Sequence, residues 1–124
     1  MNAPTLIAPT IIERTLIEML RPAAKELASY ADSLANFMDN WTSEVLTVER
    51  DGIATIIHFE TSWDCDYTPA TYDSPSEFDK LSQSVEIIDI EIEAYDEDLQ
   101  GYELGEDFKR DYMQILEDLT NNRL

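Results

Sequence analysis

The spacing of apolar residues changes twice along the chain. Between residues 10 and 41, apolar side chains recur every three or four positions, the period of a helix with one buried face. Between residues 45 and 59, and again from 85 to 95, they alternate with polar residues, as in strands covered on one side. The helical period returns from residue 106. The pattern therefore predicts N-terminal helices, three strands and a closing helix.

The first helix is expected to begin near Thr10 and to contain Pro22. Residues 10–13 (Thr-Ile-Ile-Glu) form a capping box, so residues 1–9 are predicted to be an irregular lead-in. Pro22 lacks an amide hydrogen, and it either kinks this helix or begins a second one. An apolar stripe follows, which predicts either a core helix or the seam of a homodimer. It includes Leu27, Leu34, Met38 and Trp41.

Asp51-Gly52 predicts a tight hairpin within residues 43–63. A type I′ turn needs positive φ at both central residues, and Asp-Gly is among the pairs that tolerate it. A two-residue loop also fixes the register of the strands, so Val48 is expected opposite Thr55.

A third strand is expected over residues 85–95, with its isoleucines on one face and its carboxylates on the other. Residues 64–83 lack a clear period and are predicted to be a surface excursion with a short helical turn near 75–82. The predicted fold class is α+β: a small antiparallel three-stranded sheet with N-terminal helices and a C-terminal helix packed on one face. Residues 1–124 are predicted to form a single domain.

Composition supports a folded protein of a reducing compartment. Apolar residues make up 44% of the 124 positions, enough for a real core. The single Cys65 has no partner for an intramolecular disulfide, which favours the cytoplasm. The sequence has neither an 18-residue apolar run nor the pattern of a signal peptide, so we expect no membrane contact.

The charge of the chain is strongly negative and unevenly distributed. Asp and Glu number 27 against 8 Lys and Arg, a net charge of −19, and residues 85–107 account for −10 of it. Such a surface is repelled by nucleic acid phosphates and acidic lipids, so direct nucleic acid binding is not expected and the natural partners are cationic. General adaptation to salt, or solubility alone, is the alternative explanation.

The acidic third strand and the turn after it are the main candidate binding site. Side chains two apart on a strand are roughly 6.5–7 Å apart, comparable to successive phosphates of a nucleic acid strand. The face is therefore expected to imitate a polynucleotide, unless its charges only protect an edge strand from aggregation. The residues are Asp89, Glu91, Glu93, Asp96, Glu97, Asp98, Glu103, Glu106 and Asp107.

A second contact patch is expected in the excursion, where aromatic and acidic side chains alternate. Aromatic residues are frequent interface anchors. The residues are Trp63, Asp64, Asp66, Tyr67 and Tyr72.

Catalytic and metal chemistry have little support in the sequence. Residues 96–107 resemble a calcium loop at three positions, but the last is Asp107 where a bidentate Glu is usual. His58 and Cys65, with nearby aspartates, lack the further Cys or His ligands of a zinc site. Phosphate loops, dinucleotide fingerprints and nucleophile elbows are absent. We therefore expect no catalytic residue, no metal, no cofactor and no enzymatic activity.

In type, the chain resembles the small acidic accessory proteins of bacteriophages that act as DNA-mimicking inhibitors. The resemblance rests on the acid-rich residues 86–107, the Asp51-Gly52 hairpin and the short helix that starts with acids. It implies a protein–protein interaction in the host cytoplasm that blocks a basic nucleic-acid-binding protein of restriction, CRISPR, recombination or transcription. The nearly balanced N-terminal third departs from that type. The alternative function is a structural or assembly protein that forms a homo-oligomer through its N-terminal helices.

Overall fold

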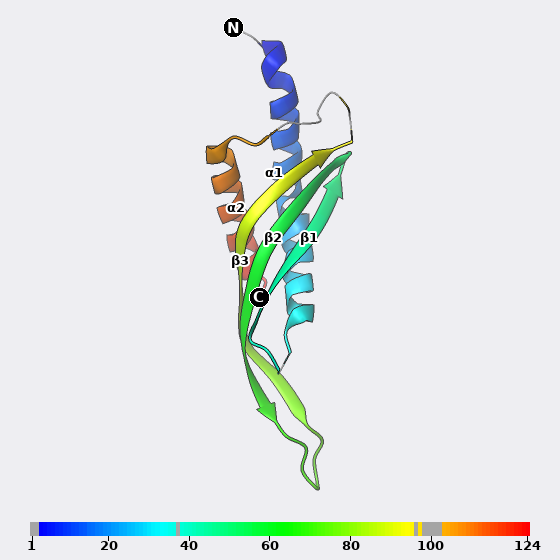
Figure 1. Ribbon diagram of the computed structural model, residues 1–124, viewed down its shortest axis with the longest axis vertical. Coiled ribbons are helices and arrows are strands. Elements are labelled where there is room, and N and C mark those ends of the chain that lie inside the picture. Colours follow the sequence, from blue (N-terminus) through cyan, green and yellow to red (C-terminus); the bar gives the residue numbers. More distant parts are fainter. Residues whose placement is uncertain (1–2, 37, 96, 98–102) are drawn as a thin grey trace.

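Two helices cover one face of a three-stranded sheet. The computed structural model describes residues 3–36, 38–95, 97 and 103–124, with the backbone alone for residues 3–10. The strands form one antiparallel sheet in the order β1-β2-β3, and both helices lie on the same side of it (Figure 1). The predicted α+β class is confirmed. The elements are α1 (Ala3–Leu34), β1 (Trp41–Arg50), β2 (Ile53–Thr68), β3 (Glu77–Ala94) and α2 (Glu106–Asn121).

The hairpin between β1 and β2 has the predicted turn and register. Asp51 and Gly52 both have positive φ, 51° and 77°, as a type I′ turn requires. Val48 lies opposite Thr55, as the two-residue loop predicts. This turn fixes which side chains of β1 and β2 point toward the helices.

The core lies between the helices and the sheet. Phe59, at the centre of β2, is fully buried and meets Tyr30 of α1 edge to face, with ring centroids 5.9 Å apart. Each fully buried large apolar side chain contributes about 1.5–3 kcal/mol of burial free energy. The other large core side chains come from both helices and from β2 and β3: Ile12, Leu16, Met19, Leu27, Ile57, Ile87, Ile90, Tyr112 and Leu116.

The N-terminal helix differs from its prediction at both ends. It begins at Ala3 rather than near Thr10. Pro4 lies in the first turn, where the backbone amides need no acceptor and proline is tolerated. The irregular lead-in over residues 1–9 is therefore wrong for the described part. The helix ends at Leu34, so the stripe does not continue to Trp41, which lies in β1. Leu27 is buried in the core and Met38 is exposed, so the four residues of the expected dimer seam share no helical surface.

Pro22 neither ends α1 nor starts a second helix, and its missing amide is compensated from the sheet. In a regular helix the amide of residue 22 would donate to the carbonyl oxygen of Glu18. Instead Nη1 of Arg50 donates to that oxygen at 3.4 Å, and Nη2 lies 3.9 Å from the Glu18 carboxylate. The last residue of β1 is thereby joined to the middle of α1.

The second and third strands are longer than predicted. The sequence predicts a helical turn at 75–82, but β3 begins at Glu77 and pairs with an extension of β2 to Thr68. The turn prediction is wrong because it used local signals, whereas pairing between residues far apart decides this segment. Two bulges interrupt the ladder and leave Ile88 and Leu81 without a paired residue. Ile88 is consequently 49% exposed and does not share the buried side of Ile90.

Side chains of α2 cover the outer edge of β3. The backbone amide of Val85 donates to Oδ1 of Asn121, whose Nδ2 donates back to the Val85 carbonyl, at 2.8 and 3.0 Å. The amide of Ile87 donates to Oε1 of Glu117 at 2.8 Å. These bonds occupy backbone groups that would otherwise pair with another strand.

The contact between Pro22 and Arg50 predicts a coupled effect on stability. Pro22→Ala restores the helical hydrogen bond and is expected to raise the free energy of unfolding by about 1–3 kcal/mol. Arg50→Ala should lower stability in the natural background but much less in the Pro22→Ala background. Urea unfolding of the two single variants and the double variant measures the coupling. Strictly additive effects would contradict the proposed compensation.

Candidate functional site

The open face of the sheet carries carboxylates but no cation. Strand alternation and the pairing register place ten acidic residues on the side of the sheet that faces away from the helices. Across the described strands, no Lys or Arg occupies a position on that side. We call this surface the acidic face. Its residues are Glu49, Glu60, Asp64, Asp66, Glu77, Asp79, Glu86, Asp89, Glu91 and Glu93.

All eight basic residues lie on the helix side of the molecule. Six are on or directly after α1 and α2, and the two strand residues, Arg50 and Lys80, bind Glu18 and Asp32 of α1. Acidic residues occur on both sides of the sheet. Those on the helix side share that side with the cations, whereas on the open side Lys109 reaches Asp89 at the edge of the sheet. The eight are Arg14, Arg21, Lys25, Arg50, Lys80, Lys109, Arg110 and Arg123.

Two like-charged pairs lie directly across neighbouring strands on the acidic face. Glu60 is opposite Glu86, and Asp66 is opposite Asp79. Directly opposed like charges destabilise a sheet, and nothing in the pairing requires acids at these four positions. Each pair therefore concentrates negative charge on the face at a cost in stability.

The three acids of the predicted strand site have different surroundings. Asp89 accepts a hydrogen bond from Nζ of Lys109 at 2.5 Å, and this contact holds the pKa of its carboxyl below the usual value although partial desolvation opposes the shift. Asp89 is therefore neutralised by α2. Glu91 and Glu93 are exposed on the face, as predicted.

The acids after the strand are only partly on the acidic face. Glu97 and Glu103 are exposed between β3 and α2, while Glu106 and Asp107 occupy the first turn of α2, where they complement the helix dipole. Asp107 also lies 3.2 Å from Nη2 of Arg110. The predicted site residues Asp96 and Asp98 lie outside the described residues, as does half of the calcium-like loop.

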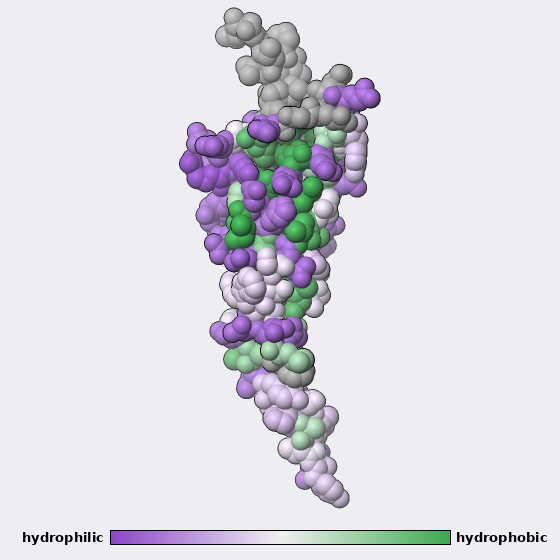
Figure 2. Space-filling model, viewed as in Figure 1, coloured by the Kyte–Doolittle hydropathy of each residue, from purple (hydrophilic) through white to green (hydrophobic). Residues whose placement is uncertain are grey.

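Apolar side chains that were not predicted from the sequence lie among the carboxylates of the acidic face. Figure 2 shows this face, with hydrophobic patches beside strongly polar ones on the upper part of the molecule. Trp41 and Val45 on β1 and Ile88 on β3 are each about half exposed. On β2, Ile56 lies between Thr47 and Glu91 on the same side of the sheet. The sequence nevertheless contained a signal for these side chains. Alternate residues of a strand face opposite sides of the sheet, and β1 and β2 carry apolar residues at both odd and even positions.

Two polar side chains connect the strands of the acidic face. Tyr95 donates a hydrogen bond to Glu49, and that contact raises the pKa of the tyrosine. Nε2 of His58 lies 3.4 Å from Oε2 of Glu91, although the approach lacks hydrogen-bond geometry. His58 is the one histidine of the chain and sits among carboxylates of β3.

The five residues of the predicted second patch differ in exposure. Trp63 is buried and donates from Nε1 to the carbonyl oxygen of Asn36 at 2.8 Å, so its proposed contact role is wrong. The other four members, Asp64, Asp66, Tyr67 and Tyr72, are exposed. They lie on the extension that continues below the helices in Figure 1.

The described residues offer no metal centre. His58 points to the open side of β2, whereas Cys65 points to the helix side and contacts the Asn36 carbonyl, so the two cannot act together. No cluster of three or more His, Cys, Asp or Glu side chains among the described residues could hold a metal ion.

An open groove runs between β3 and α2 on the side of the sheet edge. Its volume is about 510 Å³, and its walls carry both signs of charge. Glu117 at its floor already accepts the Ile87 amide, so the groove is part of the edge protection described above. The lining residues include Glu86, Ile87, Glu106, Lys109, Met113 and Glu117.

The cost of the opposed carboxylates can be measured directly. Glu60→Gln removes the repulsion from Glu86 and is expected to raise the free energy of unfolding by about 0.2–1 kcal/mol. Glu93→Gln is the matched control, since its cross-strand neighbour Ala54 carries no charge. Urea unfolding at low salt compares the two, and equal effects would show that overall charge, not the pair, is responsible.

The ion pair of Asp89 with Lys109 predicts a pH-dependent contribution to stability. Because the folded-state pKa of Asp89 is below its ordinary value of 3.8, the stabilisation is present above that value and is lost as pH falls through the folded-state pKa. Lys109→Met should raise the pKa of Asp89, measured by carboxyl NMR titration. Its stability loss at neutral pH should be under about 1 kcal/mol, since both groups are partly exposed. An unchanged Asp89 titration would contradict this.

Comparison of the chain with protein-family models, with curated proteins and with solved structures finds no match in any of the three. Among the described helices, none has the length and apolar character needed to cross a membrane.

Proposed function

We propose that this chain is a non-enzymatic binding protein whose acidic face occupies the basic groove of a nucleic-acid-handling protein in place of the nucleic acid. One observation carries the proposal: every Lys and Arg lies on the helix side, while ten carboxylates lie on the open side of the sheet. A cationic groove would be attracted to this side of the molecule, where Lys109, at the edge of the sheet, is the one Lys or Arg among the described residues that contacts a carboxylate of the face.

The spacing of these carboxylates suits a partner surface that normally binds a polynucleotide. Glu91 and Glu93 are two residues apart on β3, which corresponds to roughly 6.6 Å along the strand. In each opposed pair, the Cβ atoms of the two acidic residues are roughly 5 Å apart across adjacent strands. Lys and Arg side chains that normally contact phosphates could bind these carboxylates and release counterions in the same way.

Exposed apolar side chains on the same face add a contact that phosphates do not offer. Trp41, Val45 and Ile88 lie within the acidic face, so a bound partner would bury apolar surface together with its ion pairs. Hydrophobic burial does not weaken with salt, whereas the charge contacts do. The proposed complex therefore combines fast electrostatic association with a contact that slows dissociation.

A matched pair of triple variants tests the proposal. Glu86→Gln, Glu91→Gln and Glu93→Gln neutralise the acidic face, while Glu26→Gln, Asp111→Asn and Asp118→Asn neutralise exposed acids of the helices. Each triple changes the net charge from −19 to −16. Asp89 is left intact because Lys109 already neutralises it. Affinity for a fluorescently labelled nona-arginine peptide is measured by anisotropy at low and high salt.

The face triple is expected to weaken binding about tenfold, since three exposed charge contacts are each worth about 0.5 kcal/mol. The helix triple should change it much less. Equal losses in the two triples would show that overall charge alone attracts the peptide, and the face would have no special role. Recovery of nucleic-acid-binding proteins from a lysate by the natural chain but not by the face triple would then identify the partner.

A further inference from the structure

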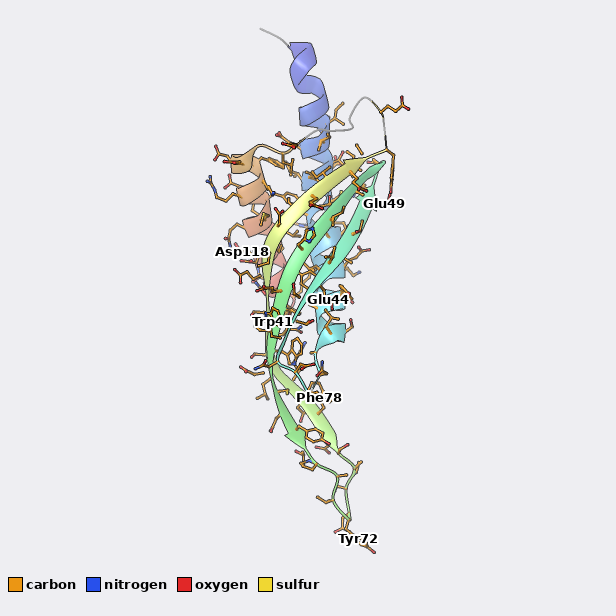
Figure 3. The ribbon with its side chains drawn as sticks, viewed as in Figure 1. Trp41, Glu44, Glu49, Tyr72, Phe78 and Asp118 are labelled. Carbon is orange, nitrogen blue, oxygen red and sulfur yellow. The ribbon has the colours of Figure 1, made fainter. Side chains whose placement is uncertain are left out.

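Residues 64–82 form an arm that extends beyond the helix layer. The helix α1 ends at Leu34, but β2 and β3 continue as a two-stranded ribbon to a tip near Tyr72 (Figures 1 and 3). No helix covers this ribbon among the described elements. Two-stranded ribbons of this kind have little stability of their own in water. The arm is therefore stabilised by its attachment to the body or by a bound partner.

The root of the arm is held firmly by α1. Nε2 of Gln83 donates to the carbonyl oxygen of Ala31 at 2.7 Å and to Oγ1 of Thr61 at 2.9 Å. Lys80 bridges Asp32 of α1 and the side chain of Gln83. The Ala31 carbonyl belongs to the last turn of α1, where carbonyl groups lack a regular helical partner. The direction of the arm relative to the acidic face is thus fixed, although its outer part lies outside the core.

The two faces of the arm have different chemistry. Asp66 and Asp79 oppose each other on the side continuous with the acidic face, and Asp64 lies beside them. Tyr67 and Phe78 oppose each other on the other side and are each more than a third exposed. Tyr72 at the tip is fully exposed. Residues 64–82 hold five acids and one base, a net charge of −4.

We propose that the arm is the element that enters the partner, and that the cleft which receives it is lined with arginine side chains. This inference rests on the proposed function and specifies its partner chemistry. A guanidinium group forms paired hydrogen bonds with carboxylates and stacks on aromatic rings, whereas an ammonium group does neither as well. The arm offers carboxylates on one side, aromatic rings on the other and a tyrosine at the tip.

A second copy of the chain is a poorer occupant. Two arms packed face to face would bring charges of −4 together. Two strands of five residues also cover only about 160 Å² on one face, far below the roughly 800 Å² that each partner buries in a stable complex. A cleft, in contrast, contacts both faces and the tip of the arm, and the acidic face of the body adds to the contact.

Replacement of the arm provides the first test. Residues 66–79 are exchanged for Asn-Gly, which joins the paired Cys65 and Lys80 by a two-residue turn. The matched control changes Glu49, Glu86, Glu91 and Glu93 to Gln, so both variants carry a net charge of −15. Binding of labelled nona-arginine and nona-lysine peptides is measured for each. The fluorescence of the buried Trp63 verifies that the body is folded.

An aromatic variant separates arginine recognition from charge. Tyr67→Thr, Tyr72→Ser and Phe78→Thr keep every carboxylate of the arm. The natural chain is expected to bind nona-arginine about tenfold more tightly than nona-lysine, and this preference should fall to about twofold in the aromatic variant and in the arm replacement. The glutamine control should weaken both peptides but keep the preference.

The possible outcomes distinguish a failure of the arm proposal from a failure of the proposed function. Equal losses in the arm replacement and the glutamine control, with no arginine preference, would overturn the arm proposal and leave the proposed function standing. No binding of either peptide by the natural chain would overturn both. Sedimentation that shows a dimer of the natural chain and a monomer after arm replacement would assign the arm to a second copy instead.

Discussion

Both helices pack on the same face of the sheet, and this one-sided packing determines where the charges of the protein are neutralised. Pro22 frees a carbonyl of α1 that Arg50 binds, and Lys80 binds Asp32 at the end of the same helix. Lys109 reaches only the edge of the sheet, at Asp89. Arg50 and Lys80 therefore bind groups of α1, and Lys109 belongs to α2. The opposite face keeps its carboxylates without a Lys or Arg among the described strand positions.

Local sequence signals predicted the parts of the fold that local chemistry decides. Asp51-Gly52 gave the turn and the register of β1 and β2, since positive φ is a property of those two residues. The paired extension to Thr68 and Glu77 was missed because it depends on pairs of residues 9 to 18 positions apart, from Thr68 with Glu77 to Asp64 with Ser82, that have no strong local preference. The length of α1 was missed because the capping box at Thr10 was taken as the start of the helix, although Thr10 lies inside it. The contact of Arg50 with the helix at Pro22 depends on the fold and has no local signal.

The sequence predicted the negative charge of the candidate site but not which residues form it. Proximity in sequence suggested one block over residues 85–107, yet strand alternation and pairing gather acids from Glu49 to Glu93 across three strands. Asp89, central in the predicted site, is neutralised by a lysine twenty positions later, which no periodicity reveals. Glu60 and Glu86 become neighbours only through the register of β2 and β3. Pairing therefore creates the acidic face, and the sequence supplies only its charges.

The opposed carboxylates link binding to stability. In the free protein, Glu60 faces Glu86 and Asp66 faces Asp79, and each pair raises the energy of the folded state. A cation placed between two such carboxylates removes their repulsion and adds an attraction, so the relief belongs to the complex alone. The same charges in an isolated position would give a partner less free energy, because no repulsion would be lost on binding. One pair lies on the body and the other on the arm, and a basic cleft that spans both would gain at each end.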